Sequence, residues 1–471
     1  MRRLSQWFQR KVRPGTAFIL GLLSVVMLGT AALRWLPTTP PDRPIGLVDA
    51  LFTATSAVCV TGLIVRDTAT AFTPLGQWII LVLIQVGGLG VMLFSGTVSL
   101  LLGHGVSLRD SSVMRELFQG EVLKETRQII RFILGMTAVV ETIGTVVLFF
   151  GLRPVVPGFR ACLATALFHS VSAFCNAGFS LFSGSLTGVV DRPAVTLPVA
   201  ALLITGGLGF PVVANLLAWG RGRALRHRRL REEHRRLEAG AATTRRLVTR
   251  LSVATRTVLS MTLLLLVLGT VLLLALEWNG AFAGASPWHK LSWAFFQAAT
   301  TRTAGFNTMD LTLLSPAAVL LLILLMGIGA GPASTAGGIK VTTLAVLWAN
   351  ARSIAQGRMA VKLFDREVTL LTVRRAFMVF FAWFATAMLG TFVLLVSEGQ
   401  AYLPTVFEVV SAMGTVGLSL GLTPELSVFG RLVIVVLMFV GRVGPLGVAY
   451  GLVTPAREHN VRYPRAQVIV G

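Results

Sequence analysis

The chain has 471 residues, of which 54% are hydrophobic and only 13% are charged. This balance excludes an ordinary soluble domain, in which charged residues approach a quarter of the total, and indicates an integral membrane protein. The net charge of +22 comes mainly from arginines that cluster between long apolar segments, so it indicates cytoplasmic loops of a membrane protein and argues against nucleic acid as a partner.

Long apolar segments recur in pairs along the chain. About 20 helical residues cross a hydrocarbon core ~30 Å thick, and the segments have this length. Four of them open a unit, at residues 17–36, 129–150, 258–276 and 376–396. Four others close a unit, at residues 78–102, 195–219, 316–349 and 426–452. The sequence therefore predicts eight transmembrane helices in four pairs.

Between the two spans of each unit lies a short block that ends in glycine followed by leucine or phenylalanine. The four blocks are SAVCVTGL, SAFCNAGF, ATTRTAGF and SAMGTVGL. Their glycines, separated by 116, 127 and 112 residues, are Gly62, Gly178, Gly305 and Gly417. A phenylalanine stands ten residues before each glycine, at Phe52, Phe168, Phe295 and Phe407. Four matches in register indicate an internal repeat.

The segment before each block, about 12 residues long, is too short to cross a membrane and predicts a re-entrant half-helix. Two full crossings per unit return the chain to its starting side, so all four units share one orientation. Basic connections between units, at residues 109–131, 221–256 and 352–375, place both termini in the cytoplasm. We predict an all-α membrane protein with four parallel repeats, each of span, pore helix and span, around a pseudo-fourfold central pore.

The predicted boundaries follow from this repeat. They are 1–103 for the first repeat, 104–220 for the second, 221–257 for a basic cytoplasmic linker, 258–352 for the third repeat, 353–455 for the fourth, and 456–471 for a cytoplasmic C-terminal tail.

The glycine blocks have the composition that a backbone ion site requires. A dehydrated cation needs oxygen ligands, and carbonyls turned inward from four extended loops supply them. Glycine permits the backbone angles of such a turn, and the negative C-terminal end of each short helix favours a cation. One block alone would indicate helix packing through small residues, whereas four in register favour an ion site. The predicted ion-binding residues are Cys59, Val60, Thr61, Gly62, Cys175, Asn176, Ala177, Gly178, Arg302, Thr303, Ala304, Gly305, Gly414, Thr415, Val416 and Gly417.

These motifs resemble the Trk/Ktr/HKT cation transporters, and most closely their bacterial Ktr-type membrane subunit. They read TSAVCVTGL, SAFCNAGFSL, TTRTAGFNT and SAMGTVGLSLGLT, and the resemblance covers essentially the whole chain. It implies a potassium filter of backbone carbonyls, no cofactor in this chain, and sodium as a candidate coupling ion. In some plant members a serine in place of the first glycine goes with sodium transport, so four glycines favour potassium. A sodium-selective or weakly selective transporter of the same fold is the alternative.

A glycine-rich run, GIGAGPASTAGGIK at residues 327–340, interrupts the second span of the third unit. Such a run weakens a helix, and its polar groups are acceptable within a membrane only beside water or protein. By resemblance to the Ktr-type family, the run is an intramembrane gating loop below the filter. The predicted gate residues are Gly327, Gly329, Gly331, Ser334, Thr335, Gly337, Gly338, Lys340 and Arg442.

Charged residues inside the predicted spans need separate interpretation. Arg442 lies in the last span, where a central arginine costs about 2.5 to 3.5 kcal/mol. The resemblance places it at the constriction beside the gating loop, and the alternative is a snorkelling or paired structural arginine. Glu141, also inside a span, is interpreted as an acid of a packing network.

Arg302 stands three residues before Gly305, beside the predicted cation site. Because an unpaired buried charge is costly, we expect its side chain to point behind the filter and to pair with Glu408 or Asp310. Asp67 and Asp310 each follow a filter glycine by five residues. They either concentrate cations at the outer mouth or are solvated loop residues.

The resemblance also implies partners. It predicts a homodimer in the cell membrane, docked on a cytosolic ring of nucleotide-binding Ktr-type regulatory subunits that bind ATP and ADP. The basic stretch 221–256 and the C-terminal tail are candidates for contact with that ring, and the basic stretch also for anionic membrane lipids. The six histidines and three cysteines form no kinase, hydrolase or zinc-ligand pattern. We therefore expect a transporter, with an alternating-access carrier and a membrane enzyme as remote alternatives.

Overall fold

The computed structural model describes residues 14–103, 112–237 and 250–444. Helices account for nearly all regular structure in these ranges, which confirms the predicted all-α class. The predicted tail 456–471, the end of the last predicted span and the start of the chain lie outside the described residues.

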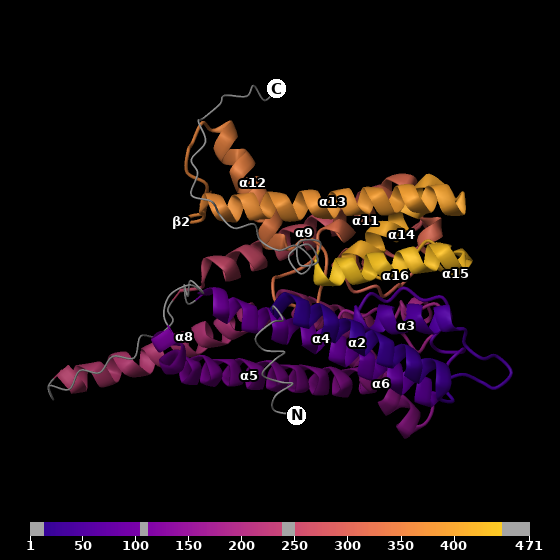
Figure 1. Ribbon diagram of the computed structural model, residues 1–471, viewed down its shortest axis with the longest axis horizontal. Coiled ribbons are helices and arrows are strands. Elements are labelled where there is room, and N and C mark those ends of the chain that lie inside the picture. Colours follow the sequence, from indigo (N-terminus) through magenta and orange to yellow (C-terminus); the bar gives the residue numbers. More distant parts are fainter. Residues whose placement is uncertain (1–13, 104–111, 238–249, 445–471) are drawn as a thin grey trace.

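Each predicted repeat begins with a long helix followed by a short one. The long helices are α2 (Pro14–Trp35), α5 (Ser112–Leu152), α9 (Val253–Glu277) and α13 (Leu370–Glu398). The short helices that follow are α3 (Leu47–Val58), α6 (Phe159–Phe174), α10 (Pro287–Thr300) and α14 (Tyr402–Gly414). Every short helix packs against the long helix that precedes it. In Figure 1, α2, α5 and α13 run across the view in roughly the same direction, with the N-terminal half of the chain below the C-terminal half.

The segments predicted as second spans differ from one another. The first of them, α4 (Pro74–Gly103), is one long unbroken helix, whereas in the second unit α7 (Pro193–Leu208) and α8 (Phe210–Leu237) meet at a bend of 96°. Gly209 adopts φ +86° at this bend, and Pro211 follows it. In the third unit α11 (Pro316–Gly327) and α12 (Val341–Ala355) flank the glycine-rich run. In the fourth, α16 (Val428–Val443) is preceded by the short α15 (Leu422–Glu425).

Within the described ranges, five helices are long and apolar enough to cross a membrane: parts of α2, α4 and α5, and the whole of α9 and α13. The bent α7–α8 pair makes a sixth span if it is counted as one. Their outward faces carry large apolar side chains, such as Leu28, Phe150 and Phe392, which are 71%, 69% and 65% exposed. Surfaces of this kind suit a hydrocarbon environment.

Contacts between the predicted repeats follow a cycle. α4 packs against α6, α7 against α10, α11 against α14, and α16 against α3. A helix late in each unit therefore touches the short helix of the next unit, and the last unit returns to the first. This arrangement brings the C-terminal ends of the four short helices together.

Two glutamates bind the first residues of later helices in the same way. Glu277 accepts hydrogen bonds from Ser315 N and Oγ at 2.9 and 2.5 Å, and Glu398 accepts from Ser427 N and Oγ at 2.9 and 2.6 Å. Each serine is the N-cap of the helix that follows, α11 or α16. The carboxylates therefore tie the end of α9 to α11 and the end of α13 to α16.

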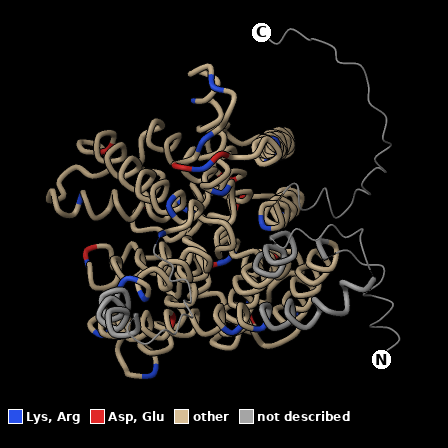
Figure 2. The backbone as a smooth tube through the Cα atoms, turned by 90° about the vertical axis from the view of Figure 1, so that its left-hand side faces the viewer, with Lys and Arg blue, Asp and Glu red and all other residues tan. Residues whose placement is uncertain are grey.

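A two-stranded hairpin, absent from the predicted fold, lies between α12 and α13. Its strands are β1 (Lys362–Leu363) and β2 (Arg366–Glu367). Arg256 of α9 donates to Asp365 in the turn at 3.2 Å. α12 and the hairpin lie at one end of the molecule (Figure 1), and the view from that side shows many lysines and arginines but few acidic residues (Figure 2).

Candidate functional site

Four loops with one backbone conformation follow the short helices, and we call them the glycine loops: residues 59–62, 175–178, 302–305 and 414–417. In each loop the residue two before the glycine has positive φ, at Val60 (55°), Asn176 (58°), Thr303 (69°) and Thr415 (49°). The glycines themselves have φ of 91°, 70°, 75° and 92° in chain order. A left-handed backbone is unfavourable for residues other than glycine. Its recurrence at the same position of all four loops therefore indicates that the surrounding structure imposes this conformation.

The four glycines form a closed ring of contacts. A Cβ atom added to Gly62 would lie 2.5 Å from Ala177 O, and one added to Gly178 would lie 2.9 Å from Ala304 O. A Cβ at Gly305 would overlap Val416 O, and one at Gly417 would overlap Thr61 O. Each glycine thus faces the carbonyl that precedes the next glycine, and the fourth loop returns to the first. Any side chain at these positions would have to displace a neighbouring backbone.

The carbonyls of the ring are available for a ligand. Among the described residues, no hydrogen bond is made to the carbonyl oxygens of Thr61, Ala177, Ala304 and Val416. Buried backbone carbonyls are nearly always paired. Four unpaired oxygens around one axis therefore have the chemistry of a cation site.

Hydroxyl groups behind the loops hold this conformation. Ser56 Oγ accepts from Gly62 N at 3.1 Å and donates to Leu63 O at 2.7 Å. Ser172 Oγ donates to Phe179 O at 2.8 Å, and Ser411 Oγ accepts from Gly417 N at 3.1 Å. In the third loop alanine takes the serine position, and the next residue, Thr300, donates to Phe306 O at 2.8 Å. These hydroxyls were not among the predicted site residues, although three blocks begin with serine at the same distance from the glycine.

A second set of unpredicted contacts lies at the ends of the short helices. A Cβ on Gly87, Gly206 or Gly441 would overlap the carbonyl oxygen of Val58, Phe174 or Met413, respectively. Glycine therefore allows α4, α7 and α16 to approach the last residues of α3, α6 and α14. The sequence signal for this packing is a glycine cluster in each of the three spans: QVGGLGV, ITGGLGF and FVGRVGP.

On one side of the ring lies a cavity of about 470 Å³. Its lining includes all four ring glycines and residues that follow them, including Asp67 and Asp310. Asp67 accepts hydrogen bonds from Ala69 N at 2.8 Å and Ser183 Oγ at 2.5 Å. Asp310 accepts from Thr312 N and Oγ1 at 2.9 and 2.7 Å, at the start of the short 3-10 helix η2 (Leu311–Leu313). Both residues therefore line the cavity, and their carboxylates shape the loops.

The expected ion pair of Arg302 is wrong. Its side chain is only 6% exposed, and it makes no ion pair within the described residues. Glu408 instead accepts from Ser419 Oγ at 2.8 Å and from Thr423 Oγ1, and Asp310 caps its own turn. Short local hydroxyl contacts satisfy both acids, so neither is free to bind the arginine.

The predicted gating run 327–340 begins with Gly327, the last residue of α11, and is otherwise non-helical. We call residues 327–340 the intramembrane loop. Gly331 N donates to Gly207 O at 2.8 Å, beside the α7–α8 bend, and Thr335 Oγ1 donates to Phe174 O at 3.2 Å at the end of α6. Ser334 Oγ closes the loop on Gly331 O at 2.7 Å. The bend in α7–α8 therefore provides the backbone groups against which the loop is held.

Two basic side chains bind the intramembrane loop. The guanidinium of Arg442, 5% exposed, donates to Thr335 O in the loop and to Gly87 O in α4 at 3.2 Å. Lys340 Nζ donates to Ala336 O at 2.5 Å and to Gly337 O at 3.3 Å. Backbone carbonyl oxygens thus accept hydrogen bonds from both charged groups. Arg442, itself in α16, joins the loop to α4 as well.

Glu141 belongs to a network behind the second glycine loop. Gln85 donates to Glu141 Oε2 at 3.2 Å, and the Cys175 thiol donates to Gln85 Oε1 at 3.5 Å. Ser170 Oγ also donates to Glu141 O at 2.8 Å. The predicted packing-network acid therefore has a partner, Gln85, that the sequence did not identify.

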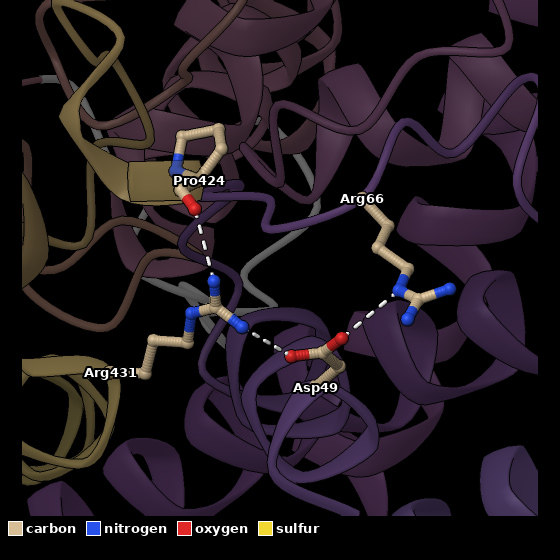
Figure 3. Close-up of polar contacts among 4 residues, drawn as sticks. All are labelled: Asp49, Arg66, Pro424 and Arg431. Carbon is tan, nitrogen blue, oxygen red and sulfur yellow. Dashed lines mark hydrogen bonds and ion pairs between the residues drawn. The ribbon is translucent and has the colours of Figure 1, made fainter. Parts of the chain in front are cut away.

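An ion-pair cluster on the first short helix joins the last unit to the first (Figure 3). Asp49 of α3 accepts from Arg66 Nε at 3.0 Å and from Arg431 of α16 at 2.7 Å. Arg431 also donates to Pro424 O at 3.0 Å. The Asp49 side chain is 13% exposed, so water screens these pairs less than surface pairs.

We expect Asp49→Asn to lower the stability of the protein by about 1 to 3 kcal/mol, because two partly buried guanidinium groups lose their charged acceptor. The measurement is thermal unfolding of the purified protein in detergent. Asp42→Asn is the matched control, since the Asp42–Arg43 pair is 3.8 Å long with side chains 73% and 84% exposed, and such a pair contributes little. Equal shifts for the two variants would contradict the role of Asp49 in joining the units.

Comparison with known proteins gives a consistent result. Residues 23–456 match the TrkH family, described as cation transport proteins. The chain is 34% identical over 460 residues to Ktr system potassium uptake protein B of Bacillus subtilis, with 97% of each chain covered. It is 37% identical over 452 residues to the protein of the same name from Vibrio alginolyticus, covering 95% of this chain and 92% of that one. It is 33% identical over 472 residues to potassium/sodium uptake protein NtpJ of Enterococcus hirae, covering 98% of each.

The fold also has a counterpart among solved structures. The crystal structure of the potassium transporter TrkH from Vibrio parahaemolyticus matches with a TM-score of 0.70 and 19% identity, covering 94% of this chain and 86% of that chain. These matches confirm the predicted resemblance and a multi-pass membrane protein of a transporter family rather than an enzyme. The chain belongs to the TrkH family of cation transport proteins.

Proposed function

We propose that this chain carries potassium into the cell through the ring formed by the four glycine loops. The observation that supports the proposal is the closed ring, in which four carbonyl oxygens without hydrogen bonds alternate with four glycines. A dehydrated cation supplies the partner that these oxygens lack. The cyclic contacts that join α4, α7, α11 and α16 to the short helix of the next unit support four parallel repeats around one pore. We also propose that both termini lie in the cytoplasm, on the side of the basic connections between units.

Potassium is favoured over other cations on two grounds. The relatives in Bacillus subtilis and Vibrio alginolyticus are named potassium uptake proteins, and all four loops keep glycine at the ring. Asp67 and Asp310 in the cavity wall would raise the local concentration of cations. A weakly selective potassium and sodium transporter is the second candidate, because the Enterococcus relative is named for both ions.

The intramembrane loop is proposed as the gate, with Arg442 as the residue that holds it closed. Control would come from a cytosolic ring of nucleotide-binding regulatory subunits that binds ATP and ADP. We also propose a homodimer of this chain. Sodium is proposed as a coupling ion and not as the main cargo.

Growth of a potassium-uptake-deficient bacterium on limiting potassium tests the function. Cells that express this chain with a cognate regulatory subunit should grow and take up rubidium. Gly62→Ser should reduce rubidium uptake and admit sodium, because an added side chain meets Ala177 O. If the membrane-inserted protein carries both rubidium and sodium at comparable rates, the weakly selective candidate stands. If it carries sodium but no rubidium, both candidates fail and a sodium-selective transporter of the same fold remains.

A further inference from the structure

Four side chains line the cavity beside the ring at equivalent positions of the repeat. The residue two places after each ring glycine belongs to the wall of this cavity of about 470 Å³: Ile64, Ser180, Asn307 and Ser419. The residues whose carbonyls form the ring precede the glycines and are not part of the wall. An ion that enters from the cavity therefore passes these four side chains before it reaches the carbonyls.

In the fourth unit a buried acid binds the serine from behind the wall. Ser419 Oγ donates to Glu408 Oε2 at 2.8 Å, and Thr423, which also lines the cavity, donates to Glu408 Oε1. Glu408 lies in α14, is 0% exposed and makes no ion pair within the described residues. A carboxylate accepts hydrogen bonds and does not donate them. Both hydroxyl protons therefore point to Glu408, which is not part of the cavity wall.

The second unit repeats this arrangement with a histidine. His169, 1% exposed, stands nine residues before its ring glycine, as Glu408 does, and its Nε2 lies 3.0 Å from Ser180 Oγ. Its Nδ1 lies 2.8 Å from Thr165 O. Because a carbonyl only accepts, Nδ1 carries the proton and Nε2 of the neutral ring accepts from Ser180. The Ser185 carbonyl lies farther from Ser180 Oγ, at 3.5 Å, so the serine proton points to the histidine.

Each of the two serines keeps one oxygen lone pair without a partner. A hydroxyl oxygen has one proton and two lone pairs. Ser180 Oγ accepts from Phe182 N at 3.0 Å, and Ser419 Oγ accepts from Gly421 N at 3.1 Å. Thr423 Oγ1 lies 3.2 Å from Ser419 Oγ, but its single proton is already donated to the carboxylate. Among the described residues no other donor reaches the second lone pair of either serine.

The two serines come from opposite sides of the ring. The ring of glycine contacts runs through the units in chain order, so the second and fourth units lie across its axis from each other. In the first and third units the two places hold Thr53 with Ile64 and Phe296 with Asn307, and neither repeats the pair. Oxygen atoms on opposite sides of an axis can replace part of the water shell of a cation on that axis.

We propose that Ser180 and Ser419 form a second alkali-cation site on the cavity side of the glycine ring, with His169 and Glu408 as positioning residues that turn the two hydroxyl protons away from the ion. The inference rests on the proposed function, to which it adds this site. Glu408 also places a negative charge behind the site, where water screens it little. The site holds a partly dehydrated potassium ion before that ion enters the carbonyl ring.

The first test is rubidium uptake by cells that express the chain with a cognate regulatory subunit, measured over a range of rubidium concentrations and normalised to membrane protein. Ser180→Ala and Ser419→Ala should each raise the KM at least threefold and lower the maximal rate less than twofold. Because both oxygens bind the same ion from opposite sides, the double variant should raise the KM by roughly the product of the two increases.

A second cycle tests the positioning role of Glu408. Glu408→Gln places an amide donor against one of the two hydroxyls and should raise the KM at least threefold. Combined with Ser419→Ala, it should give a KM clearly below the product of the two single increases, because the acid acts partly through that serine. Glu398→Gln is the matched control. Glu398 also accepts from a serine, Ser427, but neither residue lines the cavity, so this variant should keep the KM within twofold.

Binding can be followed without transport. Rubidium should raise the melting temperature of the purified protein in detergent, with a half-maximal concentration at least threefold higher in the double serine variant than in the wild type. If the wild type transports rubidium and the serine variants change neither the KM nor this concentration, the inference is overturned and the proposed function stands. If the expected shift appears but no variant transports rubidium, the site is supported and potassium transport is not. A wild type that neither transports rubidium nor is stabilised by it would overturn both.

Discussion

Gly417→Ala is expected to lower rubidium uptake at least about tenfold without loss of membrane insertion. Gly417 has φ 92°, and an added Cβ would overlap Thr61 O across the ring. The substitution therefore displaces a carbonyl proposed as an ion ligand, and a loss of about 1.4 kcal/mol in ion binding corresponds to tenfold. Uptake in intact cells, normalised to the amount of protein in the membrane, measures the effect.

Gly421 provides a matched control in the same loop. Its φ of 91° is close to the 92° of Gly417, but an added Cβ meets nothing within 4 Å. Gly421→Ala should cost about 1 to 2 kcal/mol of stability for the left-handed backbone and keep most of the uptake. Loss of uptake in both variants would show that backbone strain, and not the close contact across the ring, determines transport.

Arg442→Gln is expected to produce a cation leak that no longer depends on a regulatory subunit. The substitution removes a charged donor that binds Thr335 O in the intramembrane loop and Gly87 O in α4. Hydrogen bonds from a charged group contribute about 1.5 to 3 kcal/mol each. Loss of about 3 kcal/mol from the closed state raises the ratio of open to closed protein on the order of a hundredfold. Rubidium flux into liposomes that contain only this chain measures the leak.

Arg442→Lys separates charge from geometry. Lysine keeps the positive charge but lacks the planar fork that binds two carbonyls at fixed positions. We expect an intermediate leak, smaller than that of Arg442→Gln. If Arg442→Lys equals wild type, the charge alone forms the barrier. If neither variant leaks, Arg442 does not hold the loop.

The features that the sequence predicted best are those that depend on local periodicity. The segments predicted at 17–36, 258–276 and 376–396 appear as α2, α9 and α13, close to the predicted bounds, and the short segments before the glycine blocks also appear as helices, because length and apolar content determine both. The segment 129–150 is part of the longer α5, and two of the second spans are interrupted. The glycines were found by register, and the structure brings Gly62, Gly178, Gly305 and Gly417 into one ring of contacts. Their role as an ion filter remains a prediction, which the variants Gly62→Ser and Gly417→Ala would test.

The features that the sequence missed depend on which residues meet in space. Gly209 was read as part of one span, but its φ of 86° and the following Pro211 produce a bend of 96°. The partner of Arg302 was wrong because Glu408 finds nearer donors in Ser419 and Thr423. The hairpin after α12 is only two residues per strand, too short for a period-two pattern to stand out.

One polypeptide, and not four identical subunits, forms the ring of contacts. Each of the four glycine loops can therefore have its own sequence. Arg302 stands in one loop where the others have Cys59, Cys175 and Gly414, and the intramembrane loop belongs to one unit alone. A substitution that weakens ion binding by roughly 0.7 kcal/mol occurs once in this chain and lowers the binding constant about threefold. In four identical subunits the same substitution would occur four times, and the total of roughly 2.8 kcal/mol would lower the binding constant about a hundredfold. If the proposed filter and gate are correct, single substitutions in this protein change ion selectivity and gating in smaller steps than the same substitution in four identical subunits.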